Sequence, residues 1–187
     1  MTSEGQAPPD WTLIGNGSSG GGTYHAVRIT GAGSARGRLT CQHLRVTGHL
    51  RVQGDVRSEE IQVAGHLRVA GDCSAESFDT EGAFTIRGLL NAGRITIRLV
   101  GAARAAEMGG TVIHVTRPPR QRGAPARLTV AVIEGDTVHV EEATHATVVR
   151  GRDVDVGPGC VIDRLEYSRT FHQSPQARVT HVVHVEA

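Results

Sequence analysis

The sequence predicts an all-β protein: a single-stranded parallel β-helix, in which coils of 16–17 residues form a three-sided solenoid. Three observations predict this fold. Glycines recur at a fixed step, apolar residues recur at the same step, and apolar and polar residues alternate between the glycines. A short repeat of this kind buries its apolar side chains only by stacking on its neighbours. The sequence therefore indicates one elongated repeat array.

Glycines mark the expected corners of the coils. They fill 24 of the 187 positions, yet two series of four keep a 17-residue step without a gap. Glycine tolerates tight backbone bends that other residues resist, so each series predicts a row of corners. The two series are Gly31, Gly48, Gly65 and Gly82, and Gly37, Gly54, Gly71 and Gly88.

Apolar residues between these glycines predict strands with one buried face. The clearest coils are RVTGHLRVQGDVRSEEI (45–61) and QVAGHLRVAGDCSAESF (62–78), where apolar and polar residues alternate. Alternation with a period of two is typical of a half-buried strand. Because the pattern returns after 17 residues, we expect Leu67 to lie directly above Leu50, at the sheet spacing of about 4.8 Å.

The second half of the chain follows a different step. The alanine-rich segment 102–108 interrupts the pattern and could form a helical turn or two. Residues 117–127 (RPPRQRGAPAR) contain three prolines, which lack the N–H that a strand ladder needs, so they predict an excursion loop. Repeats then resume with a 16-residue step, because 134–149 matches 150–165.

These patterns divide the chain into four segments. We expect a disordered N-terminal segment at 1–10, a first β-helix block at 11–116 and the Pro/Arg-rich excursion at 117–127. The second block, 128–187, is expected to stack on the first.

Composition excludes several classes of protein. A net charge of +1 gives no overall attraction to nucleic acid or membrane, and 3% aromatic residues leave few rings to stack on bases. Cys41, Cys73 and Cys160 are odd in number and form no CxxC motif, as expected in a reducing cytoplasm. We see no signal peptide and no membrane-spanning apolar run. We expect a cytoplasmic protein, with peripheral attachment to the inner face of the membrane left open.

No motif predicts an active site. His49 and His66 would stack outward on adjacent rungs, but the equivalent positions 32 and 83 are alanine, so a third metal ligand is missing. Cys73 falls on an inward position, whereas Cys160 follows Gly-Pro-Gly and could be exposed. We therefore expect no enzyme activity, no catalytic or metal-binding residues and no cofactor.

Two surfaces are candidates for binding. Outward-facing basic residues could meet an anionic partner or lipid headgroups: Arg45, His49, Arg51, His66, Arg68, Arg117, Arg120 and Arg122. The two ends of a β-helix carry unpaired backbone groups, which invite pairing with another chain. The apolar residues expected at a polymer interface there are Trp11, Leu13, Ile14, Val179, Val182, Val183 and Val185. The group around Trp11 could instead fold over the first coil.

The tandem units GHLRVQGD (48–55) and GHLRVAGD (65–72) resemble those of the bactofilins, the bacterial polymer-forming cytoskeletal proteins. Two longer segments, GNGSSGGGTYHAVRITGAG (15–33) and IEGDTVHVEEATHATVVRGRDVDVGPGCVIDRLEYS (133–168), resemble the subgroup found in firmicutes and their relatives. The resemblance covers residues from about 11 to 185.

The resemblance implies a right-handed β-helix of triangular section that polymerises without nucleotide. Such polymers act as scaffolds for cell shape, envelope organisation or motility. The implied partners are further copies of the chain or a paralogue, together with membrane-associated or envelope proteins, and neither nucleic acid nor a small-molecule substrate. The second repeat block departs from the commoner members, which have one uninterrupted β-helix between short disordered tails.

Two other readings stay open. Hexapeptide-type β-helix acyltransferases also stack short coils, but their coils have 18 residues, whereas Leu44, Leu50, Val56 and Ile61 here step by six, six and five. A discrete, non-polymerising β-helix that docks a partner is the third class. The size of the purified protein without nucleotide separates such a module from a polymer.

Overall fold

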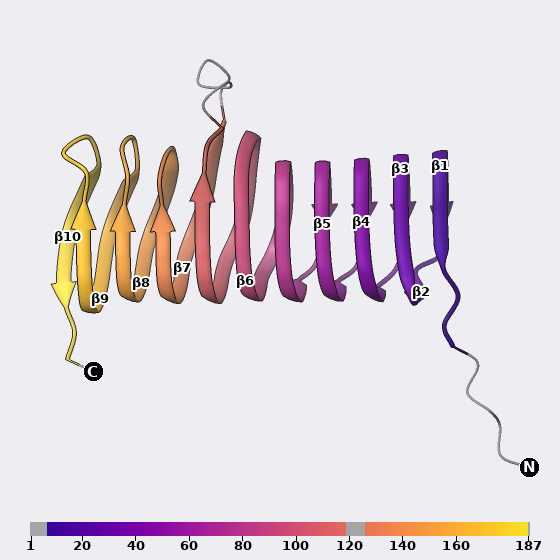
Figure 1. The fold of residues 1–187 in the computed structure, drawn as a ribbon, viewed down its shortest axis with the longest axis horizontal. Coiled ribbons are helices and arrows are strands. Elements are labelled where there is room, and N and C mark those ends of the chain that lie inside the picture. Colours follow the sequence, from indigo (N-terminus) through magenta and orange to yellow (C-terminus); the bar gives the residue numbers. More distant parts are fainter. Residues whose placement is uncertain (1–6, 119–125, 187) are drawn as a thin grey trace, which may run out of the picture.

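The chain forms one parallel ladder of stacked coils, shown side-on in Figure 1. The computed structural model describes residues 7–118 and 126–186. All the strand pairs between its elements are parallel, and the described residues contain no helix. The strands are β1 (Trp11–Ser19), β2 (Gly22–Thr23), β3 (Ala26–Ala35), β4 (Leu39–Val52), β5 (Val56–Val69), β6 (Cys73–Thr116), β7 (Arg127–Val140), β8 (Thr144–Val156), β9 (Val161–Gln173) and β10 (Arg178–His184).

The register confirms the predicted β-helix. Leu50 on β4 pairs with Leu67 on β5, and Val52 pairs with Val69. Both leucines are buried, because the inward side chains of successive coils stack into one core that runs along the solenoid. Phe78 and Phe84 lie in this core, with ring centroids 5.6 Å apart.

Three corners divide each coil of the first block into three sides. In the coil that contains β4, the corners lie at Gln42–His43, at Gly48 and at Gly54–Asp55. Gly65, the corner equivalent to Gly48, has a φ of +136°, and a Cβ atom there would collide with the carbonyl oxygen of Gly48. Glycine is therefore required at this corner by both backbone conformation and space.

Aspartates complete the third corner by reaching along the solenoid axis. Asp55 Oδ1 accepts a hydrogen bond of 3.1 Å from the backbone N–H of Asp72, one coil further on. Asp72 Oδ1 accepts one of 2.8 Å from the N–H of Leu89 in the same way. A Cβ atom at Gly71 or Gly88 would collide with these carboxylates. The GD dipeptides at 54–55 and 71–72 therefore each tie their own coil to the next one.

The alanine-rich segment 102–108 is a strand, and the prediction of a helical turn there is wrong. Ala103 and Ala105 are buried at alternating positions of β6, and Ala103 pairs with Leu128 on β7. A two-residue alternation places the small side chains inward, and ladder hydrogen bonds outweigh the helix propensity of alanine.

The excursion lengthens one coil and the second block then continues the ladder. Ala102 pairs with Arg127, a step of 25 residues, and residues 119–125 of the predicted excursion lie outside the described part of the chain. From β7 to β8 the step is 16, as predicted, and Val149 pairs with Leu165. A register shift at Gly151/Asp153 then raises the step to 17.

Candidate functional site

The N-terminal end of the solenoid is closed by its own side chains. Trp11 and Leu13 pair with Val27 and Ile29 and are half-buried at the top of their inward columns. The Leu13 side chain fills space left by Gly17, where a Cβ atom would lie only 2.7 Å from Leu13 Cδ1. The expected interface residues Trp11 and Leu13 therefore cover the first coil, whereas Ile14 points outward and is 83% exposed.

Hydrogen bonds fasten this closed end. Tyr24 lies against Trp11, with ring centroids 5.8 Å apart, and its hydroxyl is 2.6 Å from Ser19 Oγ. Asp10 Oδ1 accepts from the backbone N–H of Ala26 at 3.1 Å and lies 3.2 Å from His25 Nδ1. The hydrogen bond with His25 is the main cause that lowers the pKa of Asp10. Asp10 thus belongs to the folded end, while residues 1–6 of the segment expected to be disordered lie outside the described residues.

The C-terminal end is more open. Val179 and Val182 on β10 pair with the buried Ile162 and Leu165, so they end two inward columns, and Val182 is 45% exposed. Val183 is half-buried and Val185 is 44% exposed. The pairing of β10 reaches only as far as Tyr167 on β9, which leaves the later part of β9 without a strand above it.

Phe171 lies in that uncovered part of β9. It pairs with the core residue Val154 and is half-buried, with its ring centroid 5.4 Å from that of Tyr167. Sequence reasoning did not select either aromatic, although both follow from the pairing of β9 with β8. The end of the solenoid therefore presents an apolar surface of valines and two aromatic rings beside the unpaired edge of β10.

Ion pairs hold the last coils together from outside. Arg169 binds Asp153, and Arg150 and Arg164 contact Glu166 at 2.9 and 2.6 Å. The hydrogen bond from Arg169, followed by that from Thr170, holds the pKa of Asp153 below its usual range. Hydrogen bonds from Arg164 and then Arg150 lower the pKa of Glu166 in the same way.

The predicted anion-facing residues do not form one surface. His49, Arg51, His66 and Arg68 lie together between two glycine corners, with His49 paired to His66 and Arg51 to Arg68. Arg45 lies before the Gly48 corner, on the adjacent side.

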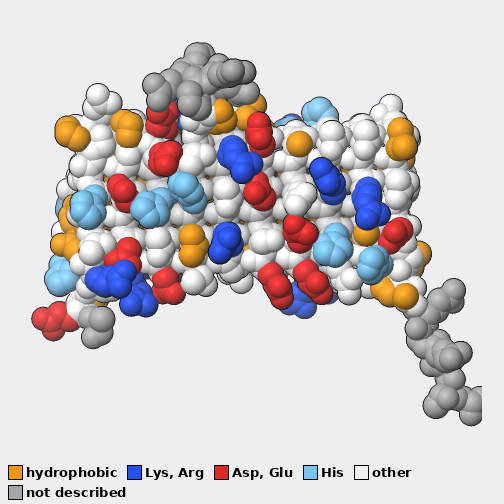
Figure 2. Space-filling model, in the orientation of Figure 1, with side chains coloured by type: hydrophobic (Ala, Val, Ile, Leu, Met, Phe, Trp, Pro, Cys, Tyr) orange, Lys and Arg blue, Asp and Glu red, His pale blue; other side chains and the backbone are white. Residues whose placement is uncertain are grey.

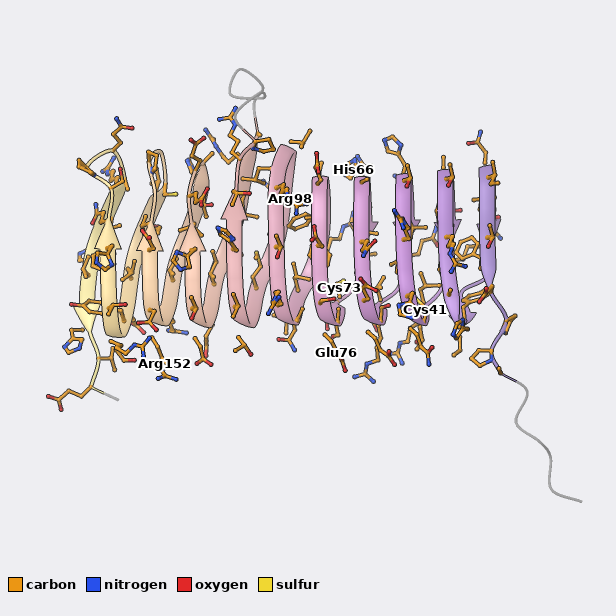
Figure 3. All side chains as sticks on the ribbon, viewed as in Figure 1. Cys41, His66, Cys73, Glu76, Arg98 and Arg152 are labelled. Atoms are coloured by element: carbon orange, nitrogen blue, oxygen red, sulfur yellow. The ribbon has the colours of Figure 1, made fainter. Side chains whose placement is uncertain are left out.

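That adjacent side carries charges of both signs. Arg98, labelled in Figure 3, contacts Asp79 and Glu81 there, at 3.3 and 3.9 Å, and Arg45 lines the same groove. Arg117 follows the end of β6 and is half-buried, and Arg120 and Arg122 lie outside the described residues.

Positive charge accumulates around His66. Its pKa is lowered, first by partial burial and then by repulsion from Arg68 and His49. The two imidazole rings are 5.9 Å apart, and Arg68 Nε lies 3.4 Å from His66 Nε2. The alanines at positions 32 and 83 pair with His49 and His66, as predicted. Within the described part of the chain, no group of three or more His, Cys, Asp or Glu residues is arranged to hold a metal ion.

The structure contains a second histidine column, which the sequence interpretation did not identify. His114, His139, Asp155 and His172 pair successively across β6, β7, β8 and β9. His114 Nε2 lies 3.2 Å from the Glu141 carboxylate, and His139 Nδ1 lies 3.5 Å from that of Asp155. Figure 2 shows histidines and carboxylates gathered over these strands. The sequence spacings between neighbouring members of this column are unequal. The column can therefore be predicted only if the length of the excursion and the register shift are known.

The three cysteines are free and buried. Cys73 is inward, as predicted, and burial raises the pKa of its thiol to about 12. Cys160 is 1% exposed, so the expectation of an exposed thiol is wrong; its Sγ lies 3.4 Å from the carbonyl oxygen of Val140. The Gly-Pro-Gly corner turns the chain back inward at this residue. Cysteine thiols with a raised pKa are poor nucleophiles because little thiolate forms.

A groove lies along the side where β6, β7 and β8 stack. Its volume is about 710 Å³, and glycines form much of its floor, including Gly110, Gly135 and Gly151, which pair in register. Glu107, Glu134, Asp136, Arg150 and Arg152 also line it, but no serine, cysteine or histidine does. This side therefore lacks the residue types of a nucleophile paired with a histidine base.

The geometry defines a parallel β-solenoid with one closed and one open end. Among known proteins, the chain is 40% identical over 97 residues to the uncharacterized protein YhbF of Bacillus subtilis (strain 168), a match that covers 49% of this chain and 40% of that protein. It is 38% identical over 101 residues to the uncharacterized protein YhbE of the same organism, covering 50% of this chain and 42% of that protein.

The matched part thus covers about two fifths of each relative. No protein-family model and no solved structure matches the chain. No helix in the described segments is long and apolar enough to cross a membrane.

Proposed function

We propose that the protein is a non-enzymatic, nucleotide-independent scaffold of the bactofilin kind, which assembles by stacking copies end to end. The observation that carries this proposal is the C-terminal end. There, an edge strand leaves its outer backbone groups unpaired beside apolar side chains that no further described coil covers. An unpaired edge next to an apolar surface is a ready site for adding another strand.

A second copy would extend both the ladder and the core. Val182 ends the column of Leu165, Val149 and Ile133, so a coil placed on β10 would bury it as those residues are buried. Burial of apolar area contributes about 25 cal/mol per Å², and the new ladder hydrogen bonds supply direction. The partner is a further copy or a paralogue, and the assembly serves cell shape, envelope organisation or motility in the cytoplasm or at the inner face of the membrane.

The competing enzyme reading has less support. Hexapeptide-type acyltransferases need coils of 18, whereas the first block pairs with a step of 17 and β7 pairs with β8 with a step of 16. The large groove also has no histidine among its lining residues. The remaining alternative is a discrete module that docks a partner without polymerising. The next experiment distinguishes it from a polymer.

The test is negative-stain microscopy and light scattering of the purified protein without nucleotide. We expect thin, uniform fibres. Val182→Asp places a carboxylate at the end of an inward column and should abolish them, because an unpaired charge is costly to bury. Thr180→Asp is the matched control, since Thr180 lies on the same strand and is exposed. A monomer or small oligomer of the wild type, or unchanged fibres of V182D, would overturn the proposal.

A further inference from the structure

One side of the solenoid is free of carboxylates over most of its length. It comprises one side of seven successive coils: 32–36, 49–53, 66–70 and 83–87, which follow the corners at Gly31, Gly48, Gly65 and Gly82, and 102–106, 127–131 and 143–147, which continue the same side. None of these segments contains aspartate or glutamate, although the chain has 19 acidic residues for 20 basic ones. We name this side the basic face after its exposed arginines, which are Arg36, Arg51, Arg68, Arg87, Arg104 and Arg127.

Strand pairing places these segments on one continuous surface. Arg51 pairs with Arg68, Ala102 with Arg127, and Thr129 with His145. Between the two halves, a Cβ atom at Gly101 would lie 3.3 Å from the Cβ of Ala83, so the coil of β6 that carries Arg104 lies against the one that carries Arg87. The arginines therefore follow the long axis of the solenoid.

The arginines of the basic face have no acidic partners. None of the six forms an ion pair with a described residue. Elsewhere on the molecule Arg28, Arg38, Arg98, Arg150, Arg164 and Arg169 form one, whereas Arg45, Arg57, Arg94, Arg152 and Arg178 do not. Like charges on neighbouring strands repel each other. This repulsion lowers the pKa of His66 and, through Arg127, that of His145, in both cases after partial burial. The face thus holds a concentrated positive charge that nothing in the described chain neutralises.

The shape of the face restricts its ligand. The groove at Gly110 and the smaller grooves beside Arg45, His139, His43 and Tyr24 are all lined by residues outside the basic face. No described phenylalanine, tyrosine or tryptophan is exposed on this face: Phe84, in segment 83–87, points into the core beside Phe78, and the other four are near the two ends. Without exposed phenylalanine, tyrosine or tryptophan rings, the face lacks the usual stacking platform of a single-stranded nucleic-acid site.

We propose that the basic face binds the surface of a lipid bilayer that contains anionic phospholipids. An extended series of exposed arginines along one side matches a plane of phosphate groups, each of which accepts paired hydrogen bonds from a guanidinium. Basic residues held near an anionic leaflet gain attraction from the whole surface potential as well as from single lipids. Bound in this way, the solenoid lies with its axis parallel to the membrane, and both ends stay accessible.

The test is flotation of the full chain with phosphatidylcholine vesicles that either contain or lack phosphatidylglycerol. Flotation separates vesicle binding from the sedimentation of any fibres. We expect binding only to the anionic vesicles, weakening as salt is raised because salt screens exposed charges. Replacing Arg36, Arg51, Arg68 and Arg87 with glutamine should reduce the bound fraction by more than roughly tenfold.

The matched control replaces four exposed arginines from the other sides with glutamine: Arg45, Arg57, Arg94 and Arg152. It changes the net charge equally and should reduce binding less than about twofold, since the basic face stays intact. A variant with lysine at the four basic-face positions should fold and still bind, which controls for a folding defect.

Three outcomes would overturn the proposal. They are absence of flotation, equal loss of binding in both glutamine variants, and preferential binding of duplex DNA in a competition with the anionic vesicles. None of them depends on fibre formation, which is measured without vesicles, so failure here is distinguishable from failure of end-to-end assembly.

Discussion

The two ends of the solenoid differ in how far side chains cover the apolar core. At the N-terminal end, Leu13 occupies the space above a glycine and Tyr24 is hydrogen-bonded beside Trp11. At the C-terminal end, Val182 and Phe171 end inward columns without an equivalent cover. The difference teaches that the repeat alone does not decide whether an end is closed. The side chains of the last coil decide it.

The closed end also pairs more completely. β1 pairs with β3 over all nine of its residues, whereas β10 pairs with only part of β9. Both terminal strands leave one edge unpaired, so the ends differ in side-chain cover: Val182 ends an inward column and is 45% exposed, whereas Trp11 and Leu13 are half-buried. The difference in side-chain cover favours the C-terminal end as the place where assembly starts.

Deleting the chain from Arg178 onward should have the largest effect on this contrast. It removes β10 and exposes Ile162 and Leu165, both 0% exposed in the intact chain. We expect fibres to disappear or shorten, as seen by negative-stain microscopy. Unchanged fibres would show that the C-terminal end is not the stacking surface. Deleting residues 1–6 is the control and should leave the fibres unchanged.

Gly31→Ala should detach the closed end. Gly31 has a φ of +120°, and a Cβ atom there would collide with the carbonyl oxygen of Gly15 on β1. We expect a cost of about 3 kcal/mol in the free energy of unfolding, together with faster amide exchange in β1. Gly15→Ala is the control, because Gly15 also has a positive φ but meets no atom within 4 Å. Its cost should be only about 1 kcal/mol, and equal costs would refute the steric argument.

Leu13→Ala should weaken the same end without straining the backbone. The leucine side chain lies over Gly17 and also reaches Gly33, where a Cβ atom would be 3.3 Å from Leu13 Cδ2. Losing it leaves a gap above two glycines, so we expect a loss of about 2 kcal/mol by chemical denaturation. Val179→Ala at the open end is the matched change and should cost about 1 kcal/mol or less. A larger loss for Val179 would reverse the contrast.

Tyr24→Phe should have a smaller effect. It removes the hydroxyl that lies 2.6 Å from Ser19 Oγ and keeps the ring beside Trp11. We expect a loss of about 1 kcal/mol, the usual value for one hydrogen bond. Thermal unfolding measures it, and a wild-type melting temperature would show that ring packing alone closes this end.

Acid should loosen the open end before the closed one. The pKa values of Asp153 and Glu166 are lowered in the folded chain, so both contribute stability above their unfolded pKa values, near pH 4, and lose it as the pH falls below that range. Asp10 follows the same rule at the other end, but it is one carboxylate, whereas the last coils rely on two. Amide exchange at pH 6 and pH 3 should show earlier loss of protection in β9 than in β1. Simultaneous loss would contradict this.

Most of the ladder followed from the sequence because a 17-residue step fixes register wherever glycine corners repeat. Leu50 over Leu67, the inward Cys73 and the 16-residue match of Val149 with Leu165 are all confirmed. The fold class depends only on such local regularity. The alternation of inward and outward residues also indicates that 102–108 is a strand, although its alanines suggested a helical turn.

The surfaces were harder to predict, because they depend on the irregular coils. Arg45 was grouped with Arg51, but the corner at Gly48 separates them onto two sides. The column from His114 to His172 requires the 25-residue step across the excursion, which no repeat reveals. Whether Trp11 closes the first coil depends on its contact with Tyr24 and on glycines that leave space for the side chains above them. The repeat pattern does not show these contacts.

The aspartate at the third corner has a consequence for how the chain acquires its structure. Asp55 accepts a hydrogen bond from the backbone N–H of Asp72, 17 residues later, and Asp72 accepts one from the backbone N–H of Leu89. Synthesis runs in the same direction, so at these two corners the acceptor is made before the coil that donates to it. A register slip of one residue in either coil would leave that acceptor without its donor.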